Sequence, residues 1–384
     1  MESKQDRKCV MIIAGEASGD LHGANLIKAL KNQAPGTFFC GIGGRAMRAA
    51  GARIIVDASR LSVVGITEVF SKGRSLLRGI SRAKQLLNSL EPDLLILIDF
   101  PDFNLHIAAR AKKLGVPVLY YISPQLWAWR EGRVRKIKRL VDHMAVILPF
   151  EVDFYRMHDV PATYVGHPLL DDGTPFSAIP PESLPVKDQA VGILPGSRDK
   201  EIVRNLPAML AAAKDIQRTT GGVRFVISRA PSVEKALMDG IVAEHGKGVD
   251  YRISSDHVRE VFKACRLVIA VSGTVTLEAA IWGTPAVIVY RVSPVSYWLG
   301  RALIKVKYIG LANLIAGREV LPELIQRDAS PENIARVVTG LLGDAEAMTA
   351  IHDGLKEVRE RLGGTGASAR VADIAMGMLN KGSY

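Results

Sequence analysis

The sequence contains no apolar run near the roughly 20 residues that a membrane-spanning helix requires. Its first eight residues also lack the apolar region of a secretory signal peptide. These absences argue against an integral membrane protein and against a secreted one. We therefore expect the chain to stay in the cytoplasm.

Cysteine is scarce and scattered. Cys9, Cys40 and Cys265 stand singly, without the paired spacing of a zinc site or a redox motif. We interpret all three as small residues of the core.

Anionic residues are fewer than cationic ones. The chain carries 50 Lys and Arg against 39 Asp and Glu, a formal charge of +11. This excess favours an anionic partner, for which nucleic acid, acidic lipid and phosphorylated metabolites all qualify. Charge alone does not choose among them, although no recognisable nucleic-acid-binding motif is present.

The length of 384 residues and the 48% of hydrophobic residues predict two packed domains. Continuous Val, Ile and Leu runs alternate with amphipathic helical stretches, which is typical of parallel strands buried on both faces. The predicted strands cover residues 9–14, 94–98, 118–122, 143–148, 191–194, 224–227, 267–271 and 286–290. The predicted fold class is α/β, with two doubly wound sheets.

A linker-like segment at residues 166–185 places the domain boundary near 170. The predicted domains are residues 1–170 and 171–384, with the last helices packing back toward the first domain. Residues after Ser330 read as helices, and the charged stretch 355–361 reads as a solvated helix face.

The first predicted strand runs into a small-residue loop, residues 15–20 with the sequence GEASGD. Ligands of open α/β sheets lie beyond the carboxyl ends of strands, where glycine lets them approach backbone amides. The loop is therefore a candidate binding site. The alternative is an ordinary turn whose helix is capped by Ser18 or Asp20.

Residues 41–46, GIGGRA, nearly match the dinucleotide fingerprint, which raises the alternative of an NAD-linked oxidoreductase. The acidic residue that the fingerprint requires about 20 residues later is Asp57 at best, and it comes early. A structural glycine turn is the better interpretation.

The strand at 94–98 ends in Asp99 and, three residues later, Asp102. A strand this apolar puts Asp99 in a partly desolvated position, which raises a carboxyl pKa and suits a general base. Either aspartate could instead cap the next helix, and Asp102 fits that cap better.

Trp127 and Trp129 face one way if the chain there is extended, and a basic cluster follows. Aromatic faces bind sugar rings and cations bind phosphate. Core packing beside a solvated basic helix is equally compatible. The cluster consists of Arg130, Arg133, Arg135, Lys136, Lys138 and Arg139.

Two anion-binding signals follow strands of the second half. Arg198 lies in the loop 194–198, LPGSR, where it can reach a phosphate. The stronger signal is Ser272-Gly273-Thr274, because the free amides and the dipole of a helix start bind a diphosphate. Glu278, one turn into that helix, can accept hydrogen bonds from ribose hydroxyls.

Six segments, in this order, resemble the GT-B glycosyltransferases and specifically the lipid-A-disaccharide synthase family. The segments are residues 15–20 (GEASGD), 99–104 (DFPDFN), 123–130 (SPQLWAWR), 194–198 (LPGSR), 272–274 (SGT) and 313–319 (NLIAGRE). The resemblance implies two Rossmann-like domains facing a cleft, with the acceptor on the first and the UDP-sugar on the second.

The resemblance implies an inverting transfer that joins UDP-2,3-diacylglucosamine to 2,3-diacylglucosamine 1-phosphate (lipid X), giving a β-1,6-linked disaccharide and UDP in lipid A biosynthesis. Asp99 would deprotonate the acceptor 6-hydroxyl and Arg198 would stabilise the leaving diphosphate. The implied substrate-binding residues are Ser18, Gly19, Asp102, Asn104, Trp127, Trp129, Gly196, Ser197, Ser272, Gly273, Thr274, Glu278 and Asn313.

No Asp-x-Asp motif is present, so we predict neither a metal nor another cofactor. Acylated substrates require contact with the anionic inner-membrane surface, and the oligomeric state stays open, with a homodimer as one option. Two basic amphipathic stretches fit such contact, residues 63–90 and residues 297–307, although a core-facing helix with a wet basic face fits each equally well.

Overall fold

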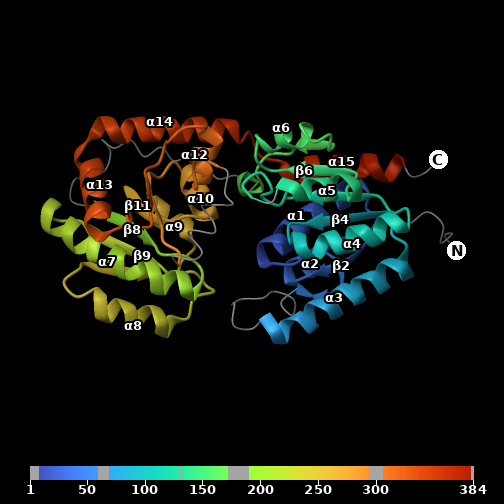
Figure 1. Cartoon of the computed structure of the whole chain (residues 1–384), viewed down its shortest axis with the longest axis horizontal. Coiled ribbons are helices and arrows are strands. Elements are labelled where there is room, and N and C mark those ends of the chain that lie inside the picture. Colours follow the sequence, from blue (N-terminus) through green and yellow to red (C-terminus); the bar gives the residue numbers. More distant parts are fainter. Residues whose placement is uncertain (1–7, 59–68, 130, 172–189, 294–305, 382–384) are drawn as a thin grey trace. The chain divides into compact units, whose positions relative to one another are not determined.

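The computed structural model describes residues 8–58, 69–129, 131–171, 190–293 and 306–381. The chain divides into two compact units, residues 1–172 with 364–384 (unit 1) and residues 173–363 (unit 2). The C-terminal segment 364–384 thus belongs to unit 1, and in Figure 1 its helix lies among the elements of that unit.

In its described part, unit 1 contains a seven-stranded parallel sheet of order β3-β2-β1-β4-β5-β6-β7. The strands are β1 (Cys9–Ala14), β2 (Phe38–Gly43), β3 (Arg53–Asp57), β4 (Leu94–Ile98), β5 (Val118–Tyr121), β6 (His143–Val146) and β7 (Ala162–Tyr164). The helices are α1 (Ala17–Gln33), α2 (Arg45–Ala49), α3 (Val69–Leu90), α4 (Pro101–Lys113), α5 (Val134–Leu140), α6 (Glu151–Arg156) and α15 (Ala367–Lys381), with short 3-10 turns at Glu131–Arg133 and Pro168–Leu170.

The described part of unit 2 repeats the plan with a six-stranded parallel sheet of order β10-β9-β8-β11-β12-β13. The strands are β8 (Ala190–Leu194), β9 (Arg224–Ser228), β10 (Tyr251–Ser254), β11 (Leu267–Val271), β12 (Ala286–Tyr290) and β13 (Glu323–Ile325). The helices are α7 (Asp199–Thr220), α8 (Lys235–His245), α9 (Val258–Ala264), α10 (Thr274–Trp282), α12 (Leu311–Ala316), α13 (Pro331–Gly343) and α14 (Ala345–Arg361).

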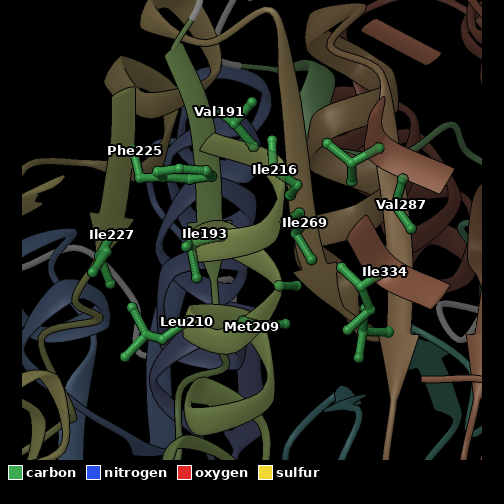
Figure 2. Close-up of a cluster of buried hydrophobic side chains, with 14 of the residues drawn as sticks. Val191, Ile193, Met209, Leu210, Ile216, Phe225, Ile227, Ile269, Val287 and Ile334 are labelled. Atoms are coloured by element: carbon green, nitrogen blue, oxygen red, sulfur yellow. The ribbon is translucent and has the colours of Figure 1, made fainter. Parts of the chain in front are cut away.

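The central strands are buried on both faces, which confirms the doubly wound α/β prediction. All five residues of β4 are buried, and alternate ones enter different core clusters: Leu95 and Leu97 in one, Leu94 and Ile96 in the other. Figure 2 shows one core layer of unit 2, in which side chains of α7 and α13 cover the strands. Burying each aliphatic side chain contributes about 1.5–3 kcal/mol, so these layers fix the strand ends that carry the site.

The cysteine interpretation is confirmed, because Cys40 and Cys265 are buried and Cys9 is partly buried. The charged residues of 355–361 lie on the solvent side of α14, as the interpretation as a solvated helix face predicts: Lys356, Glu360 and Arg361 are exposed, and Glu357 and Arg359 are half-buried. Two of the arginines also make hydrogen bonds that the sequence did not predict. Arg359 donates to the Ile281 carbonyl, and Arg361 donates to the carbonyl of Ile315 at 2.8 Å. These guanidinium groups therefore satisfy the C-terminal carbonyls of α10 and α12.

Candidate active site

Each sheet has a topological switch point where the strand order reverses. It lies between β1 and β4 in unit 1 and between β8 and β11 in unit 2. Crossovers leave a switch point in opposite directions, so the loops beyond the carboxyl ends of its two strands form a crevice for ligands. Four of the predicted motifs follow these four strands: residues 15–20, 99–104, 194–198 and 272–274.

In unit 1, Asp99 follows β4 in an unusual backbone conformation. Asp99 and Phe100 have φ angles of 45° and 47°, in the left-handed region that non-glycine residues rarely adopt. Such residues cost about 1–3 kcal/mol each and persist only where their surroundings hold them. Burial, followed by the charge of Glu16, raises the pKa of Asp99 to about 6. A carboxylate with this pKa is suited to take a proton near neutral pH.

Asp102 and Asn104 lie on α4, directly after this turn. Asp102 does not cap the helix, since the N-cap is Phe100 and no side chain caps it. Its exposed carboxylate instead pairs with Arg133 at 2.6 Å. Asn104 is fully buried, and its amide nitrogen donates to the carbonyls of Ile98 at 3.2 Å and of Asp99 at 2.6 Å. Asn104 thus holds the turn from inside.

The loop after β1 lies against the same turn. A Cβ on Gly15 would come within 2.4 Å of the Phe100 ring, so only glycine fits beside it. Ser18 is exposed at the start of α1, and Gly19 is buried against Ala14 and Ile98. The alternative of a turn whose helix is capped by Ser18 or Asp20 is not what the structure shows, since the N-cap of α1 is Glu16 and no side chain caps it.

Asp20 instead caps α2, and this removes the support for a dinucleotide site. Its carboxylate accepts from the amides of Gly44 at 2.6 Å, Ala46 at 2.9 Å and Met47 at 3.1 Å. A Cβ on Gly41 would lie 1.9 Å from the Ile12 carbonyl oxygen, so that glycine serves the contact between β1 and β2. The helix start that would hold a pyrophosphate already holds a carboxylate.

The two tryptophans considered for sugar binding, Trp127 and Trp129, do not share a surface. Residues 126–129 form a turn and not an extended strand. The Trp127 indole donates to Glu151 at 3.0 Å, and its ring packs edge-on against Phe150. The side chain of Trp129 is 40% exposed. Glu151 is fully buried, and burial raises its pKa to about 7 although the Leu148 amide also donates to it.

Of the basic cluster that follows, Arg133 pairs with Asp102, and Lys138 pairs with Asp159 at 3.0 Å. Arg130 lies outside the described residues. The cluster is thus partly neutralised by acidic neighbours, and such exposed pairs contribute little to stability.

Unit 2 contains a cavity of about 630 Å³ at its switch point. It brings together seven of the predicted residues: Gly196, Ser197, Arg198, Ser272, Gly273, Thr274 and Glu278. Its volume falls in the range typical of small-molecule sites.

One wall of the cavity is the loop after β8. Gly196 has a φ angle of 120°, and a Cβ there would lie 2.5 Å from a carboxylate oxygen of Glu201. Glu201 accepts from the Ser197 amide at 2.9 Å and pairs with Arg198 at 3.1 Å. The Arg198 side chain is 70% exposed, so a ligand in the cavity can recruit its guanidinium.

The opposite wall is the start of α10. Its N-cap is Gly273, and no side chain among the described residues caps it. The first backbone N–H groups of the helix can therefore donate hydrogen bonds to a ligand. Glu278 faces the cavity one turn later, and among the described residues it has no hydrogen-bond or ion-pair partner. Burial raises its pKa to about 7. A ligand that offers hydrogen-bond donors would satisfy this carboxylate.

Sequence reasoning missed the remaining wall, formed by the loops after β9 and β10. It consists of Arg229, Ser255, Asp256 and His257, and the Arg229 guanidinium donates to the Ser255 hydroxyl at 2.7 Å. The rule that ligands lie beyond strand ends could have found Arg229, since its strand was predicted.

Asn313, by contrast, does not line the cavity. It is fully buried, donates to the Leu321 carbonyl at 2.8 Å and accepts from the Val320 amide at 2.8 Å. Over the described residues there is no cluster of three His, Cys, Asp or Glu side chains placed to hold a metal, and no helix long and apolar enough to cross a membrane.

Comparison with known proteins shows which family this architecture belongs to. The family model for lipid-A-disaccharide synthetase matches residues 10–372. The lipid-A-disaccharide synthase of Trichlorobacter lovleyi is 48% identical over 97% of this chain and 98% of its own, and that of Geobacter metallireducens is 47% identical over the same shares.

Among solved structures, a Staphylococcus aureus MnaA complex with UDP aligns with a TM-score of 0.67 at 13% identity, covering 97% of each chain. The MurG structure from Acinetobacter baumannii aligns with a TM-score of 0.62 at 14% identity, covering 97% of this chain and 99% of that one. These likenesses give the fold as GT-B, and none of these findings favours an NAD-linked oxidoreductase. The chain belongs to the lipid-A-disaccharide synthase family, UDP-sugar glycosyltransferases of lipid A biosynthesis.

Proposed function

We propose that this enzyme transfers the sugar of UDP-2,3-diacylglucosamine to the 6-hydroxyl of 2,3-diacylglucosamine 1-phosphate. The products are UDP and the β-1,6-linked disaccharide 1-phosphate, with inversion at the transferred carbon. The observation that carries the proposal is the unit 2 cavity. Within the described part of the chain, it joins a helix start without a side-chain cap, an exposed guanidinium and a carboxylate without a partner.

On the donor side, the diphosphate lies against the first amides of α10 with Arg198 beside it. As the bond between sugar C1 and the diphosphate oxygen breaks, its electron pair moves onto the diphosphate. Aligned amides and a cation stabilise that growing charge without reorganising. Glu278 accepts hydrogen bonds from the ribose hydroxyls, which satisfies a carboxylate that has no partner among the described residues.

On the acceptor side, Asp99 accepts the proton of the 6-hydroxyl while that oxygen forms its bond to C1. Its raised pKa supports this role, because the ionised form is available at neutral pH and is basic enough to accept a proton. Ser18, Gly19, Asp102 and Trp129 are the candidates for direct contact with the acceptor. Asn104 and Trp127 act from behind them through the contacts described above.

A divalent metal is not required by this proposal, because the helix start and Arg198 together neutralise the leaving group. We therefore expect full turnover in the presence of a chelator. If a metal site formed when the substrates bind, product formation would stop in the presence of a chelator and resume on addition of excess Mg²⁺.

We further propose a peripheral docking of this cytoplasmic enzyme on the anionic inner-membrane face, supported by α3. Leu77 on this helix is 67% exposed, whereas Ile80 packs against the core of unit 1. Val64 lies outside the described residues, as does the second stretch around Trp298. Vesicle flotation tests the docking: Leu77→Ser in a folded variant should reduce flotation on anionic vesicles, and unchanged flotation would exclude this part of the helix.

The function is tested by incubating the enzyme with both substrates in detergent and analysing the products by mass spectrometry. We expect disaccharide and UDP from the wild type, and a rate lowered by about 100-fold or more in Asp99→Asn. Asp153→Asn, which changes an exposed aspartate of the same unit, is the matched control. Absence of disaccharide with the wild type would refute the proposal.

A further inference from the structure

The turn that carries Asp99 is held by a tyrosine that belongs to none of the sequence motifs. We propose that Tyr120 is a positioning residue for the transfer, whose hydroxyl fixes the left-handed turn of Asp99 and Phe100 and so aims the Asp99 carboxylate. This inference rests on the proposed role of Asp99.

The backbone of Asp99 is fixed on both sides. The Tyr120 hydroxyl donates to the Asp99 carbonyl oxygen at 2.6 Å, and the Asn104 amide donates to the same oxygen at 2.6 Å. The Asp99 amide donates to the Tyr121 carbonyl at 3.1 Å. Tyr120 and Asn104 are both fully buried, so water does not replace either donor in the folded protein.

The turn needs these stabilising contacts because two successive non-glycine residues, Asp99 and Phe100, adopt positive φ angles. Phe100 is trapped by its stack on Phe103 and by its contact with Gly15. The packing therefore fixes Phe100, and the two buried donors fix Asp99. Loss of one donor leaves the carbonyl less constrained, so the turn can relax and move the carboxylate.

The hydroxyl is a dependable donor. Burial and the neighbouring Asp99 charge raise the pKa of Tyr120 well above its ordinary value, so the proton stays on the oxygen throughout the working range. The charged groups around the turn are Glu16 from the loop after β1, Asp102 from α4 and Arg133, which pairs with Asp102. None of these side chains duplicates the contact that Tyr120 makes to the carbonyl.

The first test is Tyr120→Phe, which keeps the ring and removes the hydroxyl. We expect kcat to fall by about 10- to 100-fold with little change in KM, since a misplaced base slows the chemical step more than binding. The acid limb of the pH profile should move toward lower pH as Asp99 becomes better solvated. Tyr121→Phe is the matched control, because this neighbouring buried tyrosine lies in the core layer on the other face of the sheet.

A double-mutant cycle separates positioning from general structural damage. If Tyr120 acts through Asp99, adding Tyr120→Phe to Asp99→Asn should cause no further loss of rate. An undiminished loss in that background, or a wild-type kcat and pH profile in Tyr120→Phe alone, would overturn the inference while leaving the proposed function intact. Wild-type turnover in Asp99→Asn would instead refute the role of Asp99 itself.

All rates are compared at a temperature where thermal unfolding shows each variant to be folded. Should Tyr120→Phe fail to fold, Asn104→Ser provides the same cycle through the other donor to the same carbonyl. Additive losses with Asn104→Ser would equally overturn the inference.

Discussion

At the scale of single residues, Glu278 carries a conflict between stability and function. Its pKa of about 7 lies above that of an ordinary carboxyl, so the folded protein favours the protonated form. Stability is therefore lost as the pH rises from the ordinary carboxyl pKa of 4.5 to about 7, because the unfolded chain ionises over this range while the folded protein keeps the proton. The penalty is absent below pH 4.5 and complete above pH 7.

We predict that Glu278→Gln raises the stability of unit 2 at pH 8 by about 1–3 kcal/mol and changes it little at about pH 4, below the ordinary pKa of 4.5. The same change should weaken UDP binding, because the ribose hydroxyls lose an acceptor. Thermal melts at the two pH values and titration with UDP measure both effects. Glu360→Gln, on the exposed side of α14, should change neither, and a pH-independent gain in Glu278→Gln would contradict the assignment.

Asp99 gives a pH prediction of its own. A base must be deprotonated, so kcat/KM should fall as the pH drops below about 6, the pKa that burial and Glu16 impose. Glu16→Gln removes a like charge and should shift this acid limb to lower pH, measurable in a buffer series at constant ionic strength. Asp102→Asn, whose carboxylate is paired with Arg133, should leave the limb in place.

Some candidate residues can be predicted from the sequence and others cannot, depending on how far along the chain their partners lie. Asp99 and Arg198 follow apolar strand-length runs, and the end of such a run can be read from the sequence alone. The hydroxyl of Tyr120, within a predicted strand, bonds 21 residues away, and Asp20 bonds residues 24 to 27 positions away. Contacts between such distant residues form only once the strands are paired, so no local sequence pattern predicts them.

At the scale of elements, α10 has no side-chain cap among the residues that the structure describes, so its first amides can donate to an anion. Gly273 has an extended backbone, and a Cβ added there would meet no atom within 4 Å. A side chain can therefore be introduced at this N-cap without a steric clash.

We predict that Gly273→Asp stabilises the enzyme by a few tenths of a kcal/mol, through capping, and weakens UDP binding by about 10-fold or more, through repulsion of the diphosphate. Gly273→Asn caps the helix without a charge and should weaken UDP binding much less. Calorimetric titration with UDP distinguishes the two. Equal weakening in both variants would show that space and not charge matters at this position.

Local backbone shape separates the two tryptophans. They would face one way only in an extended chain, and residues 126–129 form a turn. The buried carboxylate of Glu151, which no local pattern in the sequence links to Trp127, draws the indole inward. Trp129, in contrast, is 40% exposed, so of the two it is the one whose ring a ligand can reach.

At the scale of the whole molecule, the C-terminal segment of the chain packs into the unit that is formed by its N-terminal part. On α15, Val371, Ala372 and Ala375 enter the same core layer as α1. The carboxylate of Asp171 accepts from the amides of Gly366 and Ala367, both at 2.8 Å, and so caps the segment that leads into this helix. The alternation of strands and helices predicted both doubly wound sheets, whereas this capping contact joins residues 195 positions apart.

We predict that Asp171→Ala destabilises unit 1 by about 1–2 kcal/mol while UDP binding to unit 2 is retained. Hydrogen exchange should quicken in peptides of α1 and α15 and stay unchanged in α7. Asp344→Ala, which removes the cap of α14 in unit 2, is the matched control and should give the reverse pattern. Uniform acceleration in both variants would contradict two separately stable units.

The central claim is that the sugar passes from the UDP held at α10 to the acceptor 6-hydroxyl with inversion. The most direct measurement is NMR of the isolated product, which reads both the linkage position and the anomeric configuration. The account predicts a β linkage to the 6-oxygen, formed from an α-configured donor. An α linkage, attachment to another hydroxyl, or release of free sugar without a disaccharide would contradict it.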